Sequence, residues 1–200
     1  MAKSFRQTIG LSPSSVDTSS GSTALLVIDA QQTYDTGAPL AITGIDASQE
    51  VIKGLVHKYR QSGAPVIWIQ HNAGAGAPIF DVKAASGDFI GDLRPQGDEA
   101  IIVKEAPSSF TRTTLEETLK KNGIKQVVLT GYMAHVCVTG TARAGFELGY
   151  DVVVVKDAIG DRDIPSHDGA SVVKAETLVD VVSHELADAI GTVVWSKDVK

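Results

Sequence analysis

The sequence predicts an α/β protein with a single doubly wound, mostly parallel six-stranded sheet that carries helices on both faces. From Thr23 onward, short apolar runs alternate with longer amphipathic segments, which is the pattern of strands alternating with helices. Several runs are β-branched throughout, as is typical of parallel strands buried on both faces. The 200 residues contain no internal repeat and no linker-like interior stretch. Residues 23–200 are therefore predicted to form one domain behind a loose polar leader at residues 1–22.

The strands are predicted from apolar runs of strand length. Val152–Val155 is the clearest of these runs, whereas the last one, LVDVVS, is weaker than the others. The six predicted strands cover residues 24–29, 65–70, 100–104, 126–131, 151–157 and 178–183.

The helices are predicted from amphipathic spacing and from stop signals. The first helix places Ile52 and Leu55 on one side, and the SGAP sequence ends it. Asn122 and Gly123 form a C-cap signal for the second helix. The predicted helices cover residues 48–61, 113–121, 138–148 and 167–177, with a further C-terminal helix at 184–190. Residues 72–98, which begin with a Gly-, Ala- and Pro-rich stretch, are predicted to form a long loop or lid.

Composition restricts the class of partner. The formal net charge is −6, which disfavours nucleic acid and anionic membranes, because both favour clustered positive charge. No apolar run is long enough to cross a bilayer. The single cysteine, Cys137, excludes an internal disulfide and a cysteine-rich metal site, and it indicates a reducing compartment. We therefore expect a cytoplasmic protein whose partner is a small molecule.

Three polar residues at strand ends are the candidates for chemistry. Asp29 ends the first predicted strand, Lys104 ends the third, and Cys137 follows the fourth. Taken singly, they are typical of a helix cap, a solvated lysine and a small buried side chain. Taken together, they lie where the carboxyl ends of parallel strands meet, which is where α/β sheets bind ligands. The strand–loop–helix order also places Cys137 near a helix N-terminus, where the thiolate is favoured.

Three segments then resemble one family. ALLVIDAQQTY at residues 24–34, IIVKEAPSSFTRTTLEETL at 101–119 and VVLTGYMAHVCVTGTARAGFELGYDVVVVKDA at 127–158 are similar to the aspartate, lysine and cysteine segments of the isochorismatase-like cysteine hydrolases. That superfamily includes nicotinamidases and N-carbamoylsarcosine amidase and has a Rossmann-like sheet. The resemblance runs from about Thr23 to Val194.

The resemblance implies a catalytic triad of Asp29, Lys104 and Cys137. Cys137 would attack an electrophilic carbon, Asp29 would serve as general base and then general acid, and Lys104 would orient both. It also implies a cis peptide bond between Tyr132 and Met133, with the amides of Met133 and Cys137 forming an oxyanion hole. The intermediate would be a thioester.

Further residues are expected around the substrate. They are aromatic, imidazole or amide side chains on segments that should surround Cys137. The expected substrate-binding residues are Gln31, Tyr34, His71, Phe110, Tyr132 and His135.

No metal and no cofactor are expected. Nicotinamidases carry a metal site built from an aspartate and histidines after the second strand, whereas this chain has only His71 there. A closed metal site needs more ligands than one histidine supplies.

The predicted function is that of a cysteine hydrolase that cleaves a C–N bond in a small amide, carbamoyl or ureido compound. Hydrolysis of a vinyl ether, as in isochorismatases, is one alternative, and a non-catalytic binding module of the same fold is another. The resemblance also implies a homo-oligomer, either a dimer or a tetramer.

Overall fold

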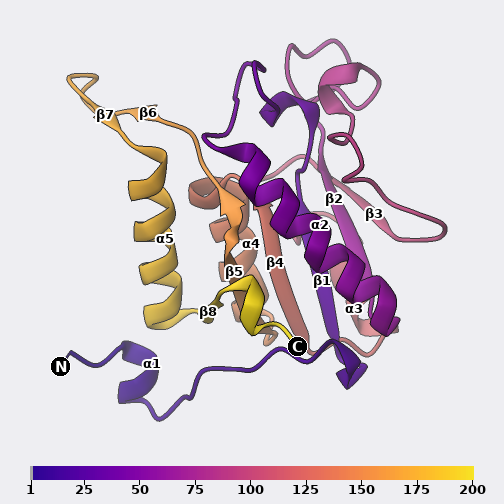
Figure 1. The fold of residues 1–200 in the computed structure, drawn as a ribbon, viewed down its shortest axis with the longest axis vertical. Coiled ribbons are helices and arrows are strands. Elements are labelled where there is room, and N and C mark those ends of the chain that lie inside the picture. Colours follow the sequence, from indigo (N-terminus) through magenta and orange to yellow (C-terminus); the bar gives the residue numbers. More distant parts are fainter. Residues whose placement is uncertain (1) are drawn as a thin grey trace.

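The computed structural model describes residues 2–200 and contains a six-stranded sheet in the order β3-β2-β1-β4-β5-β8 (Figure 1). Every pairing within this sheet is parallel, which confirms the predicted fold class. The strands are β1 (Thr23–Ile28), β2 (Val66–His71), β3 (Ile101–Lys104), β4 (Gln126–Tyr132), β5 (Asp151–Gly160) and β8 (Thr192–Val194).

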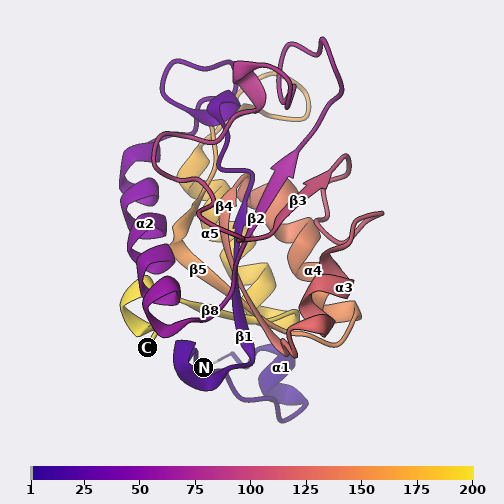
Figure 2. The ribbon, with the colours of Figure 1, turned by 90° about the vertical axis from the view of Figure 1, so that its right-hand side faces the viewer.

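Helices cover both faces of the sheet. Figure 2 shows α2 on one side and α3 and α4 on the other. The helices are α1 (Phe5–Thr8), α2 (Ile45–Ser62), α3 (Leu115–Lys121), α4 (Thr139–Glu147) and α5 (Ala175–Ala189), and a π-helical turn at Ala134–Val138 leads into α4.

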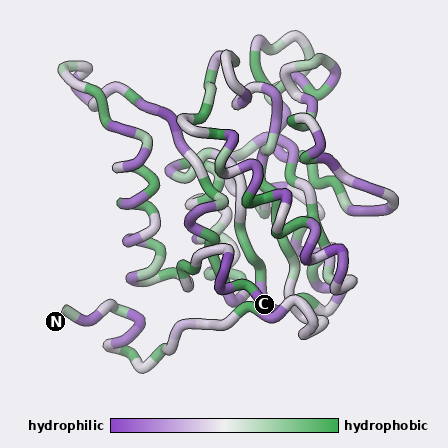
Figure 3. The backbone as a smooth tube through the Cα atoms, in the orientation of Figure 1, coloured by the Kyte–Doolittle hydropathy of each residue, from purple (hydrophilic) through white to green (hydrophobic). Residues whose placement is uncertain are grey.

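The central strands are buried on both faces because their side chains alternate between two apolar cores. Leu25 and Val27 of β1 join the core beneath α2, where they meet Ile52. Leu26 and Ile28 face the opposite core, which includes side chains of α3, α4 and α5. The apolar colour of the strands in Figure 3 reflects this double burial. It explains why β1 has a continuous apolar run instead of an alternating pattern.

The predicted strand at 178–183 is wrong, because these residues lie inside α5. Val182 and Leu186, four residues apart, are both buried against the core, while Val181 is 57% exposed. This is helical spacing. The sixth strand is instead β8, which pairs with β5 through Val154 and Val193.

The predicted helix at 167–177 is also wrong. The chain there forms a two-stranded hairpin of β6 (Ile164–Pro165) and β7 (Val172–Val173), and α5 begins only at Ala175. The hairpin turn is closed by hydrogen bonds between the Ser166 and Asp168 side chains and the backbone of Ala170 and Ser171. The predicted C-terminal helix at 184–190 is the second half of α5.

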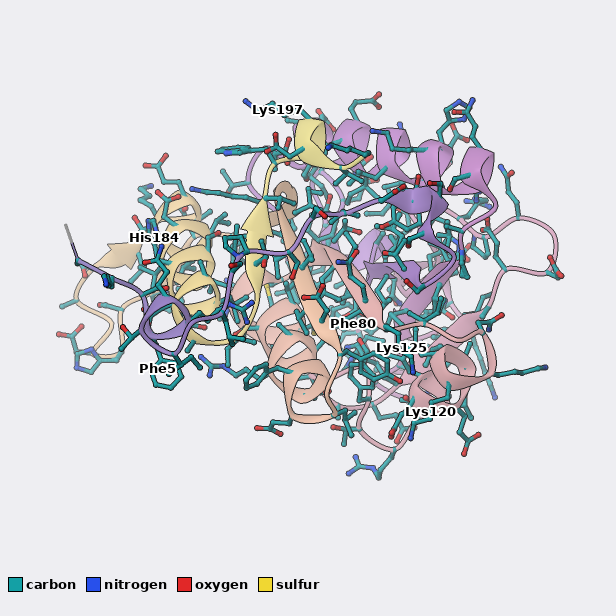
Figure 4. All side chains as sticks on the ribbon, turned by 90° about the horizontal axis from the view of Figure 1, so that it is seen from below. Phe5, Phe80, Lys120, Lys125, His184 and Lys197 are labelled. Atoms are coloured by element: carbon teal, nitrogen blue, oxygen red, sulfur yellow. The ribbon has the colours of Figure 1, made fainter. Side chains whose placement is uncertain are left out.

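The N-terminal segment lies along the domain. Val16 is buried and forms a parallel bridge with Val199, and Thr18 donates a backbone hydrogen bond to Lys200. Further out, the Phe5 amide donates a hydrogen bond to the Asp188 side chain of α5. Figure 4 shows Phe5 at the edge of the molecule, at the same end as His184 of α5. The leader predicted as loose therefore contacts the domain at both places.

One close approach of backbone fixes the geometry where β1 and β4 end. Gly131 has φ of +105°, and a Cβ atom there would lie 2.0 Å from the carbonyl oxygen of Ile28. Glycine alone tolerates both conditions. The segments at the ends of these neighbouring strands, residues 29–31 and 132–137, therefore begin close together. Along residues 2–200, no helix combines the length and the apolar character that crossing a membrane requires.

Candidate active site

The sheet brings Asp29, Lys104 and Cys137 together. The chain order runs outward from β1 to β3 on one side and from β4 to β8 on the other, so the order of the strands reverses between β1 and β4. The Lys104 Nζ atom lies 2.8 Å from Asp29 Oδ2 and 3.3 Å from Cys137 Sγ. All three are buried: Asp29 is 0% exposed, Lys104 1% and Cys137 5%. Charges act strongly on one another in such a water-poor environment.

Asp29 is held in an unusual backbone conformation. Its φ is +51°, a left-handed value uncommon for a residue other than glycine. Its amide donates to Ile69 of β2 and its carbonyl accepts from Gln31, which fix the residue on both sides. Oδ2 forms the ion pair with Lys104, and neither carboxylate oxygen accepts a hydrogen bond of regular geometry from residues 2–200. Strain of this kind occurs where a structure places a reactive group.

Cys137 lies in the π-helical turn between β4 and α4. Burial raises the pKa of the Cys137 thiol well above its usual range, and the negative charge of Asp29 raises it further, whereas Lys104 opposes the shift. The direction of this shift favours the neutral thiol. Desolvation thus acts against the helix N-terminus, which favours the thiolate. The thiol has to lose its proton as it reacts.

The turn that carries Cys137 begins at a cis peptide bond between Tyr132 and Met133. The Met133 carbonyl accepts hydrogen bonds from the amides of Val136 and Val138, which close the turn.

His71 joins this group as a fourth member. Its Nδ1 atom lies 3.0 Å from Lys104 Nζ, and its ring packs edge-on against Phe80, with ring centroids 4.9 Å apart. Gln31 clamps the His71 backbone: Nε2 donates to the His71 carbonyl at 3.0 Å, and Oε1 accepts from the His71 amide at 2.8 Å. Nε2 also donates to the Gly87 carbonyl, so both donors of Gln31 are engaged within the protein. Gln31, expected to bind substrate, instead fixes the end of β2.

Tyr34 and Tyr132 are both buried in the core beneath α2. Their rings pack edge-on, with centroids 5.9 Å apart. Burial raises the pKa of Tyr34, and the charges of Asp29, Cys137 and Asp161 raise it further. The Tyr132 hydroxyl instead pairs with Ser48 at 2.8 Å. This hydroxyl is therefore engaged within the core, and the role of Tyr132 in binding substrate stays a prediction.

Phe110, in the loop after β3, packs against α4. Its ring stacks on Tyr150 at 5.7 Å and lies so close to Gly145 of α4 that a Cβ atom there would be 3.3 Å from it. Phe110 therefore packs against the helix layer, and its assignment as a substrate-binding residue stays a prediction.

His135 is anchored by a residue that sequence reasoning missed. Asp161 Oδ2 accepts from the His135 amide at 3.0 Å and lies 2.7 Å from its Nδ1. The Asp161 carboxylate is fully buried, whereas the His135 side chain is 27% exposed. Within residues 2–200, Nδ1 of His135 is engaged by Asp161 and Nε2 has no hydrogen-bond partner. The sequence offers no local signal for Asp161, since the two residues meet only through the pairing of β4 with β5.

A metal does not fit this site. Asp29, His71 and Cys137 offer ligand atoms within 4.8 Å of one another. The Lys104 ammonium, however, lies within 3.3 Å of an atom from each of them. A second cation in the same place would be repelled, so the lysine takes the position that a metal would need.

Comparison with known proteins identifies the family. Residues 23–185 match the isochorismatase domain. The chain is 44% identical to the secreted isochorismatase effector Isc1 of Verticillium dahliae over 98% of both chains. It is 31% identical to the maleamate amidohydrolase of Pseudomonas putida, over 72% of this chain and 75% of that protein.

Solved structures agree with the family model. The fold matches the crystal structure of an isochorismatase from Pseudomonas putida with a TM-score of 0.92 and 30% identity, covering 100% of both chains. Because the Verticillium relative is described as secreted, a cytoplasmic location stays a prediction for this chain. The family model, the relatives and the shared fold together show that the chain belongs to the isochorismatase family of hydrolases.

Proposed function

We propose that the chain is a cysteine hydrolase that cleaves the C–N bond of a small amide, carbamoyl or ureido compound. The observation that carries this proposal is the convergence of a thiol, a carboxylate and an ammonium, with Lys104 Nζ 2.8 Å from Asp29 and 3.3 Å from Cys137. A nucleophile, a base and a charged group that orients both are the components of covalent acyl transfer.

The reaction follows from the protonation states. Asp29 takes the thiol proton of Cys137 as the sulfur bonds to the carbonyl carbon, and Met133 and Cys137 amides hold the resulting oxyanion. Asp29 then passes the proton to the departing nitrogen, which leaves as ammonia or an amine, and a thioester remains. Asp29 next activates a water molecule, which releases the acid and restores the thiol. Lys104 keeps the carboxylate in place throughout.

Two features favour chemistry over a non-catalytic binding module. A buried ion pair such as Asp29–Lys104 contributes little to stability compared with apolar packing, and the left-handed φ of Asp29 costs energy as well. Both features are expected where function determines the geometry.

Vinyl ether hydrolysis is the second candidate, because the 44% identical relative is described as an isochorismatase. That reaction needs a proton donor and a water molecule but no nucleophilic sulfur. Asp29 would supply the proton to the terminal carbon, and Cys137 would be dispensable.

A substrate panel separates the two candidates. The purified protein is incubated with amides, carbamoyl compounds, ureides and isochorismate, and the release of ammonia or amine is measured against the release of pyruvate. We expect nitrogen release from at least one of the first three classes. His167→Asn, on the exposed β6–β7 turn, is the control and should behave as wild type. Pyruvate release from isochorismate with no nitrogen release from any amide would contradict the proposal.

A further inference from the structure

We propose that His71 is a positioning residue for Lys104, and that unprotonated Nδ1 of His71 must accept a hydrogen bond from the lysine ammonium for full activity. This inference rests on the function proposed above. It assigns His71 a role inside the group of reacting side chains instead of at the substrate.

The contact is built into the sheet. His71 and Lys104 are paired residues at the ends of the parallel strands β2 and β3. Lys104 Nζ lies 3.0 Å from His71 Nδ1, 3.2 Å from the Ala106 carbonyl, 2.8 Å from Asp29 and 3.3 Å from Cys137. An ammonium has three N–H donors and here faces four acceptors. Its orientation therefore depends on each of them, and His71 draws it toward β2.

His71 is held independently of the lysine. Gln31 binds both its backbone amide and its carbonyl, and the ring rests against Phe80. Phe80 is itself buried, at 7% exposure, and its amide donates to Thr33. Because the imidazole is fixed from behind, it can determine where the flexible lysine side chain ends.

The contact fixes the protonation state of the ring. An ammonium only donates, so Nδ1 must carry no proton, and in the neutral ring the proton resides on Nε2. Burial lowers the pKa of His71, and the charge of Lys104 lowers it further, while the carboxylates of Asp29 and Glu105 act in the opposite direction. The ring is therefore neutral above its ordinary pKa of about 6.5. As pH falls through the lowered pKa, the imidazolium loses its acceptor and repels Lys104, so activity should fall.

Two substitutions distinguish the role of His71 as a hydrogen-bond acceptor from the effect of protonating its ring. His71→Leu removes the acceptor and should lower kcat/KM by about 10- to 100-fold, the worth of one hydrogen bond to a charged group. His71→Asn keeps an acceptor oxygen but cannot titrate, so it should lose less activity and should lack the acid-side fall caused by His71. His167→Asn serves as the control for both. Equal losses in the Leu and Asn variants, or an unchanged acid limb in His71→Asn, would overturn the proposal.

A second measurement does not depend on turnover. Nitrogen-15 NMR of the intact protein should show Nδ1 of His71 unprotonated, Nε2 protonated, and a pKa below the ordinary histidine value. In Lys104→Met, the pKa of His71 should rise, because the positive charge that lowers it is gone. A protonated Nδ1 in the neutral ring, or an unchanged pKa in Lys104→Met, would show that the contact does not exist. If no amide is hydrolysed and the NMR result holds, the proposed function fails and the contact stands.

Discussion

Replacement of Cys137 by alanine is expected to lower the hydrolysis of an amide substrate by roughly 10⁴- to 10⁶-fold, the range found when a covalent nucleophile is removed. Cys137 is the only cysteine of the chain, and its sulfur lies 3.3 Å from Lys104. No other thiol can therefore replace it as the nucleophile. Turnover by the purified variant, measured as ammonia or amine release, tests this expectation.

The control for this variant lies in the same turn. Val136→Ala removes apolar volume beside Cys137 without changing a reacting group, and it should keep activity within about tenfold. Circular dichroism should show that both variants are folded. Substantial amide turnover by Cys137→Ala would mean that the sulfur is not the nucleophile.

Replacement of Lys104 by methionine is expected to destabilise the fold by about 3–5 kcal/mol as well as to abolish turnover. The Asp29–Lys104 pair is fully buried, so loss of the ammonium leaves the Asp29 carboxylate without a counter-charge or water. The free energy of unfolding in urea measures the effect.

A surface pair provides the matched control. Lys53 pairs with Glu50 on α2, with side chains 38% and 72% exposed. Lys53→Met should therefore cost no more than about 1 kcal/mol. The double variant Asp29→Asn/Lys104→Met should recover much of the lost stability but no activity, because the uncompensated charge is gone. If Lys104→Met were no less stable than Lys53→Met, the buried ion pair would not exist in solution.

The strands were predictable because burial on both faces leaves continuous apolar runs. The same reasoning fails where a short apolar run fits both the spacing of a strand and that of a helix. Leu178–Ser183 reads as a weak strand, yet only helical spacing brings Val182 and Leu186 to the same core. Short apolar runs do not distinguish a helix from a strand, because the deciding partner is tertiary.

The reactive residues were predictable for a different reason. The carboxyl ends of parallel strands meet, so residues at 29 and 104 and after the fourth strand had to converge. Their surroundings were not predictable. Asp161 binds His135 across 26 residues, and Gln31 binds His71 across 40. Burial of Cys137, which raises the pKa of its thiol, likewise depends on packing that local sequence does not encode.

The central claim is that Cys137 forms a thioester during turnover. Intact mass spectrometry of the enzyme, quenched with acid while it turns over an amide substrate, tests this claim directly. We predict a mass increase equal to the acyl group, located on the peptide that contains Cys137 and absent from Cys137→Ala. Steady turnover with no added mass on that peptide, and with activity retained in Cys137→Ala, would contradict the account.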